Sequence, residues 1–132
     1  MRLSVGCLSV LVVACGGSSP TSGGNNNLPP GGVTVTMQEY AFAPDTVRIS
    51  AGTTVRWTNQ GNVDHTSTSD AAGGWNSGTI APPHPQMTCP YPPCGNSPGG
   101  NFDTTFPTPG TYPYHCAFHE GLGMKGAVVV TP

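Results

Sequence analysis

Residues 112–124 read YPYHCAFHEGLGM and place Cys116, His119 and Met124 in the spacing Cys-x2-His-x4-Met. A thiolate, an imidazole and a thioether are soft or borderline ligands, which suit copper better than calcium or magnesium. A second imidazole from a distant part of the chain would complete the set, and His65 is the candidate because it follows a strand-like run. Two His and one Cys with a weak axial Met make a mononuclear blue-copper electron-transfer site. The pattern therefore predicts one copper ion bound by His65, Cys116, His119 and Met124.

Each of these residues also has an ordinary structural interpretation. Taken alone, Cys116 would be a small buried residue, His119 a surface residue and Met124 a core filler. Their joint spacing, together with an upstream His, favours the metal site over these separate interpretations.

The chain resembles the plastocyanin-like cupredoxins over most of residues 33–132. Besides the ligand loop, the resemblance rests on Asp64-His65-Thr66 and on the segments 75–78, 102–106 and 108–112. It implies a cupredoxin-like Greek-key β-sandwich of about eight strands with one type 1 copper ion.

Thr66 directly follows the upstream His. In related proteins the residue at this position ties the strand of the first His to the ligand loop through a hydrogen bond, and a Thr66 hydroxyl would serve. An ordinary exposed strand threonine is an equally good account of the same residue, so both interpretations stay open.

His115 directly precedes the Cys, as does a His that binds another copper ion in multicopper oxidases and copper nitrite reductases. Strand alternation puts His115 on the face opposite Cys116. The chain has four His, so once His65 and His119 are used only His84 and His115 remain, too few for a trinuclear cluster. We therefore interpret His115 as a surface residue.

Short runs of alternating apolar and polar residues predict the secondary structure. Turn signals at Ala51-Gly52 and Pro107–Gly110 separate such runs, and Gln38–Asp45 is expected to be a connection. Several short strands at this spacing predict an all-β, antiparallel β-sandwich, and no helix with good caps is found. The predicted strands are residues 33–37, 46–50, 53–59, 65–69, 102–106, 111–116 and 126–130.

The composition bounds the class of protein. The chain has 132 residues, enough for one domain, and its 19 Gly, 15 Pro and 8% charged residues suit a turn-rich β protein. A formal net charge of −2 and the lack of a basic patch argue against nucleic acid as a partner. The expected partners are redox proteins, and the expected state is a monomer.

Residues 1–14 are predicted to be a lipoprotein signal peptide. Leu3–Val13 is an apolar run too short to span a bilayer. Val12-Val13-Ala14-Cys15 resembles the lipobox of bacterial lipoproteins, where cleavage leaves Cys15 lipidated; an ordinary secretory signal is the alternative. Residues 15–32 then form a flexible linker, since they contain too few apolar residues to fold. Such a linker would tether the domain to a membrane. A disordered tail with no tethering role is the alternative for the same residues.

The predicted domain, residues 33–132, carries an inserted loop at 83–98 where the family pattern is interrupted. In an exported protein the nearby cysteines of this loop predict a Cys89–Cys94 disulfide. A second metal site formed by these cysteines with His84 and Met87 is the alternative. Both ends of the loop are expected at the copper end of the domain.

Together these features predict a single-domain type 1 copper protein, lipid-anchored to a bacterial membrane, that carries one electron between extracytoplasmic redox partners. It is not expected to be an enzyme, because the proposed ligands leave no open coordination position. One alternative is a copper-binding module for storage, delivery or sensing at the cell surface. Another is a reductase subunit whose catalytic copper lies at a subunit interface through His115.

Overall fold

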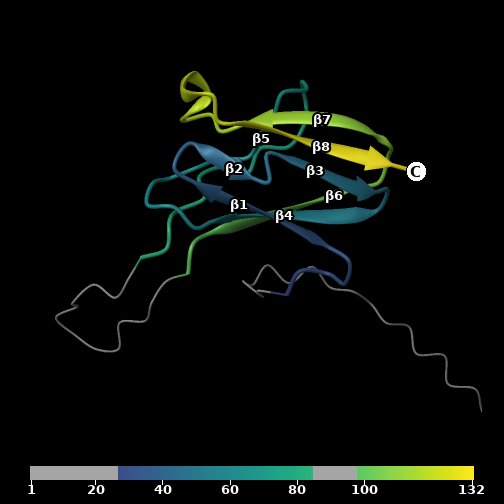
Figure 1. Ribbon diagram of the computed structural model, residues 1–132, viewed down its shortest axis with the longest axis horizontal. Helices are drawn as coiled ribbons and strands as arrows, with labels where there is room; N and C mark the ends of the chain where they lie inside the picture. The colour runs from purple at the N-terminus through teal and green to yellow at the C-terminus, as the bar shows by residue number, and fades with distance from the viewer. Residues whose placement is uncertain (1–26, 85–97) are drawn as a thin grey trace, which may run out of the picture.

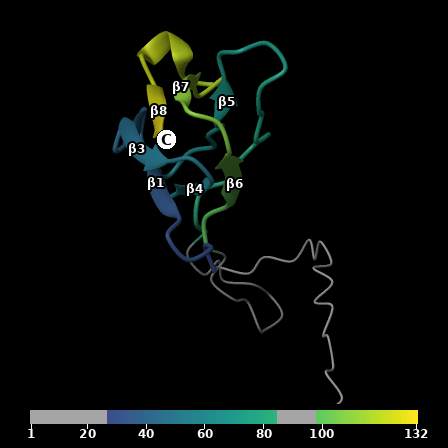
Figure 2. The ribbon, with the colours of Figure 1, turned by 90° about the vertical axis from the view of Figure 1, so that its right-hand side faces the viewer.

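The computed structural model describes residues 27–84 and 98–132 (Figure 1). It forms two four-stranded sheets, one ordered β2-β1-β4-β6 and the other β3-β8-β7-β5. Figure 2 looks along the strands and shows both layers end-on. The elements in chain order are β1 (Val33–Gln38), β2 (Ala41–Ala43), β3 (Thr46–Ser50), β4 (Thr53–Asn59), β5 (Thr68–Ser69), β6 (Asn101–Phe106), β7 (Gly110–His115), the 3-10 helix η1 (Glu120–Leu122) and β8 (Lys125–Thr131).

The predicted eight-stranded β-sandwich is confirmed, with one difference in strand direction. Each sheet contains one parallel pair, β1 with β4 and β3 with β8, so the sheets are mixed rather than wholly antiparallel. The cause is the path of the chain. It turns from β1 into β2 and continues back along the other sheet as β3, so β4 then runs in the direction of β1.

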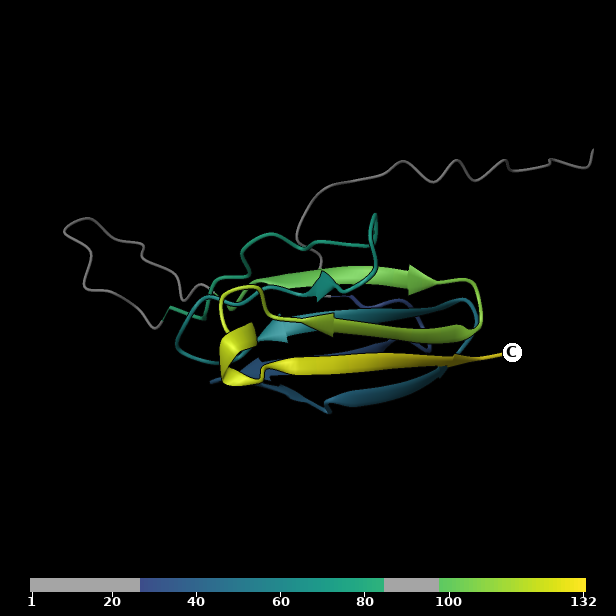
Figure 3. The same ribbon diagram turned by 90° about the horizontal axis from the view of Figure 1, so that it is seen from above.

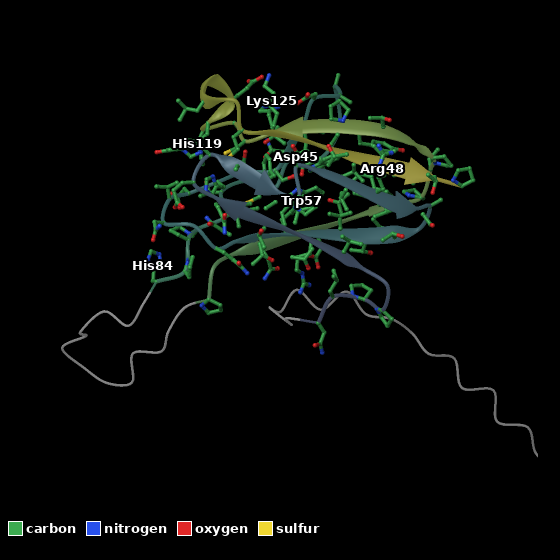
Figure 4. All side chains as sticks on the ribbon, in the orientation of Figure 1. Asp45, Arg48, Trp57, His84, His119 and Lys125 are labelled. Atoms are coloured by element: carbon green, nitrogen blue, oxygen red, sulfur yellow. The ribbon has the colours of Figure 1, made fainter. Side chains whose placement is uncertain are left out.

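Period-two alternation builds the core between the sheets. Val35 and Met37 of β1 and Val55 and Trp57 of β4 are fully buried, while their strand neighbours point to the outer face. Trp57 lies at the centre of the molecule (Figure 4). Its ring contacts Tyr114 of the opposite sheet edge-on, with the ring centroids 5.3 Å apart. An aromatic pair across the layers contributes more than its buried area alone, so this contact helps to set the spacing of the sheets.

Three local features differ from the sequence prediction. Ala41–Ala43 forms β2 where a loop was expected, because three residues are too few to show a period. The expected strand 65–69 is reduced to Thr68–Ser69, with an isolated bridge between His65 and Ile80. The ligand loop contains the short helix η1, a single turn closed by backbone hydrogen bonds. No side chain caps it, so the sequence had no capping residue from which to predict it.

Several predictions concern residues outside the described ranges. These are the signal peptide at 1–14, the lipidation of Cys15, most of the linker 15–32, the Cys89–Cys94 disulfide, and the alternative metal site that would include Met87. Within residues 27–84 and 98–132, no helix combines the length and the apolar character needed to cross a bilayer.

Replacing Asp103 by Asn would test the ion pair that joins β4 to β6. Arg56 is buried and donates two hydrogen bonds of 2.7 Å to Asp103, so the variant leaves its charge without a carboxylate partner. The side chain of Asp103 is 36% exposed, which limits the loss through solvent screening. We expect the free energy of unfolding, measured by urea denaturation, to fall by about 1–2 kcal/mol.

Thr54→Val is the matched control. The Thr54 hydroxyl meets that of Thr105 at 2.8 Å across the same two strands, but on an exposed surface. This variant should change the free energy of unfolding by less than about 0.5 kcal/mol. Equal losses in the two variants would show that the buried ion pair contributes nothing beyond a surface contact.

Candidate metal centre

The metal-ligand candidates meet at one end of the sandwich, where segments from both sheets converge. His65 follows the loop after β4, and Cys116 directly follows β7. His119 lies in the loop from β7 to β8, seen at the left end in Figure 3. The ligand atoms of His65, Cys116 and His119 all lie within 4.8 Å of one another. Of the described residues that carry such groups, only these three form a set able to hold a metal ion.

Both imidazoles direct the same kind of atom at the sulfur. The Nδ1 atom of His119 lies 3.4 Å from Cys116 Sγ, and the Nδ1 atom of His65 lies 3.8 Å from it. Burial lowers the pKa of His65, and the neighbouring His119 lowers it further. The His65 ring is therefore neutral at neutral pH and presents a lone pair. Two imidazole nitrogens and one sulfur that converge in this way fit a copper ion.

The ligand loop is closed by its own backbone. Cys116 N–H donates to Met124 O at 3.0 Å, His119 N–H donates to Cys116 O at 3.0 Å, and Met124 N–H donates to His119 O at 3.2 Å. Gly123 has a φ of 83°, a left-handed conformation that glycine adopts without strain, and it ends η1. The turn returns the chain to the site, where Met124 is fully buried. The copper site is thus formed by His65, Cys116, His119 and Met124.

Asn59 holds the segment that carries His65, and sequence reasoning missed it. Its buried side-chain amide donates to Val63 O at 2.8 Å and to Ile80 O at 2.7 Å, and it accepts from Gly61 N–H at 2.9 Å. Ile80 in turn forms a two-bond bridge with His65. The only signal in the sequence was an amide at the end of a strand, directly before a loop.

Thr66 joins the His65 segment to the ligand loop by two bonds. Its hydroxyl accepts a hydrogen bond of 2.8 Å from Ala117 N–H, and its backbone N–H donates to Cys116 Sγ at 3.3 Å. Thr66 is also buried. Of the two interpretations left open by the sequence, the geometry fits the bridging hydroxyl and not an exposed strand threonine.

His115, which we interpreted as a surface residue, is only partly exposed and lies against two carboxylates. It is half-buried, with Nδ1 at 2.5 Å from Asp70 Oδ1 and Nε2 at 3.9 Å from Glu120 Oε2. Both partners are carboxylates that are partly exposed, which fits the predicted position on the face opposite Cys116. Glu120 also pairs with Lys125 at 3.2 Å, so these charged side chains neutralise one another beside the ligand loop. Among the described residues, His115 belongs to no set of side chains able to hold a second metal ion.

His84 is exposed and lies at the same end of the molecule as His119, at some distance along the other layer (Figure 4). The described flanks of the inserted loop meet there, because Gly100 N–H donates to Ala81 O. Gly100 O also accepts a hydrogen bond from Asn59 N–H, at the end of β4. Met87, Cys89 and Cys94 lie outside the described residues, so the disulfide and the alternative metal site stay predictions.

Thr66→Val would test the bridge to the ligand loop. The variant leaves the Ala117 N–H without its acceptor, so we expect a loss of about 1–2 kcal/mol in the free energy of unfolding of the metal-free protein. The thiolate-to-copper absorption band of the loaded protein should also shift, because the Cys116 loop is less firmly held. Thr66→Ser keeps the hydroxyl and should match the wild type in both measurements. A Val variant with wild-type stability and spectrum would show that the hydroxyl bond is dispensable.

Solved structures with the same fold include several copper proteins. A purple cupredoxin from Nitrosopumilus maritimus is 26% identical with a TM-score of 0.52, over 75% of this chain and 99% of that one. A reduced amicyanin mutant is 25% identical with a TM-score of 0.54, over 77% and 84%. A copper-containing nitrite reductase from Thermus scotoductus is 25% identical with a TM-score of 0.60. This chain covers 86% of its own length in that match but only 25% of the reductase.

Plastocyanins are similar in sequence. The plastocyanin of Scenedesmus fuscus is 35% identical over 92 residues, which cover 67% of this chain and 85% of that protein. The chloroplastic plastocyanin of Tetradesmus obliquus is also 35% identical over 92 residues, but this chain spans only 57% of its length. The family model of copper-binding proteins of the plastocyanin/azurin type matches residues 31–131, a range that contains all four ligands. The chain therefore belongs to the plastocyanin/azurin family of copper-binding proteins.

Proposed function

We propose that this protein carries single electrons between two redox proteins outside the cytoplasm, by means of one type 1 copper ion. It is a small copper-binding electron carrier of the plastocyanin and amicyanin kind, and not an enzyme. The supporting observation is the convergence of two imidazole nitrogens on the buried sulfur of Cys116, at 3.4 and 3.8 Å. This is the donor set that copper accepts in both of its common oxidation states.

The protein contributes a fixed arrangement of donors. Copper bound here would supply the one-electron couple between its +1 and +2 states. Asn59 and Thr66 fix the His65 side of the site, and the backbone bonds of residues 116–124 fix the other side. The N–H of Thr66 donates to the sulfur and would partly offset the negative charge of a copper-bound thiolate. Donors held in this way move little between oxidation states, which favours fast electron transfer.

Electrons would enter and leave at the edge of His119. His65 and Cys116 are fully buried, whereas His119 is half-buried and is the ligand closest to solvent. Three large apolar side chains stand exposed near the ligand loop, Tyr40 at 47%, Phe118 at 55% and Leu122 at 64%. The Tyr40 and Phe118 rings both contact His119. An apolar face around an exposed ligand edge suits brief docking of a redox protein.

Two ligand variants would test the copper site. Cys116→Ala should abolish the intense thiolate-to-copper band, since no other described thiol lies at the site. Met124→Gln should keep copper bound but lower the reduction potential, because a harder axial oxygen favours copper(II). Absorption, EPR and a redox titration of the loaded proteins measure both effects. Copper that passes readily to chelators, without the band in the wild type, would instead indicate a storage or delivery module.

The proposed location is extracytoplasmic, on the periplasmic side of a bacterial membrane or at the cell surface, with a lipid anchor on Cys15. The lipobox-like Val12-Val13-Ala14-Cys15 supports this location. Several acyl chains together give stable membrane attachment, so the native protein should fractionate with membranes. Intact-mass analysis of the protein from its native host should show an acylated N-terminus at Cys15, and Cys15→Ser should release the protein. An unmodified Cys15 in the mature protein would refute the lipid anchor.

A further inference from the structure

The two-residue turn between β1 and β2 contains a residue that is unusual there, Tyr40. Gln38 pairs with Ala41, so Glu39 and Tyr40 alone make the turn. Tyr40 has a φ of 60°, and it is the only non-glycine residue in the described ranges with a positive value. Two-residue turns normally use Gly or Asn where φ is positive, because a bulky side chain is strained there. Strain that persists in this way points to a use for the side chain.

The ring of Tyr40 contributes little to the core. It is 47% exposed, yet it meets His119 edge-on, with the centroids 4.9 Å apart and the planes at 67°. Phe118 is a looser neighbour of the same imidazole, with the centroids 6.3 Å apart. His119 also contacts His65 on its buried side, at 5.1 Å. The imidazole is thus enclosed by the second ligand ring on one side and by Tyr40 on another.

The preceding residue, Glu39, reaches the loop that delivers the other imidazole. Its carboxylate accepts hydrogen bonds from the backbone N–H and from the side-chain amide of Asn62, the latter at 3.1 Å. The same loop is attached to β1 where Gln60 N–H donates to Met37 O at 2.9 Å. The backbone bond from Asn62 lowers the pKa of Glu39, so the carboxylate is charged and accepts hydrogen bonds at neutral pH.

We propose that the Glu39–Tyr40 turn positions both imidazole ligands, Tyr40 by restraining the His119 ring and Glu39 by fixing the loop before His65. This inference rests on the proposed copper site. The turn belongs to neither ligand segment, so it sets the two imidazoles relative to β1 and therefore to each other. A glycine at position 40 would relieve the backbone but leave the His119 ring free to rotate.

The first test uses the metal-free protein, so that it does not depend on copper binding. Histidine ring signals are recorded by NMR for the wild type, Tyr40→Gly and Tyr40→Phe. In Tyr40→Gly the His119 signals should broaden while those of His65 stay sharp, and the urea midpoint should not fall. Tyr40→Phe keeps the ring and should restore the wild-type spectrum. Sharp His119 signals in Tyr40→Gly, or broadening of both histidines together, would overturn the role of Tyr40.

Glu39 is tested in the same experiment by a matched pair of variants. Glu39→Ala removes the acceptor, so the amides of residues 60–64 should exchange with solvent faster and the His65 signals should broaden. Glu39→Gln retains an acceptor oxygen and should resemble the wild type. Unchanged exchange in Glu39→Ala would overturn the role of Glu39.

The second test uses copper. Release of copper(I) from Tyr40→Gly to a chelator should be about two- to tenfold faster than from the wild type, the range that the loss of one aromatic pair implies. Phe118→Ala, which removes the more distant ring, should release copper at nearly the wild-type rate. Equal rates for all three proteins would overturn the inference. A wild type that binds no copper would refute the proposed function, while the NMR result would still decide the role of the turn.

Discussion

The structure depends on one buried contact, the meeting of Cys116 Sγ with groups from a segment 50 residues earlier in the chain. The sulfur follows a strand of one sheet, while Thr66 and His65 follow a loop that leaves the other sheet. The N–H of Thr66 reaches the sulfur, and the Thr66 hydroxyl holds the next peptide of the ligand loop. Shortly after Thr66 the chain enters β5, where Thr68 pairs with His115 of β7, so a slip of β5 along β7 would break both bonds. The pairing of these two strands thus serves the geometry of a few atoms at the end of the sandwich.

Core and site achieve their rigidity in different ways. Between the sheets, aromatic rings pack closely, and within the described residues Trp57 Nε1 and Tyr114 OH have no hydrogen-bond partner. Burial raises the pKa of Tyr114 to about 12, so this phenol stays neutral at physiological pH. At the metal end the amide of Asn59 makes three hydrogen bonds, and among the buried side-chain polar atoms described there only His65 Nε2 has no partner. Apolar packing leaves some freedom in the distance between the sheets. Directional hydrogen bonds restrict atomic positions more tightly, at the end of the domain where the metal-ligand atoms must converge.

The ligands and most of the strands could be predicted from the sequence, because both have local signatures. Cys116, His119 and Met124 lie within one loop, and period-two alternation marks β1, β3 and β4 clearly. The parallel pairing of β1 with β4 has no local signature, since it follows from the path of the chain through the other sheet. The contacts of Asn59, Glu39 and Tyr40 could not be predicted either. Each residue acts on a partner brought close only by the fold, and nothing in its own neighbourhood in the sequence distinguishes it.

The direction of β1 and β8 gives the domain a front and a back. β1 runs parallel to β4, which leads to the His65 loop, so the chain enters β1 at the end remote from the ligands. β8 starts beside His115 and leads away, and the C-terminus lies opposite the ligand loop in Figure 1. Both ends of the fold therefore leave from the back. Whatever either end is attached to connects on the side remote from His119, so the attachment leaves the exposed edge of this ligand clear.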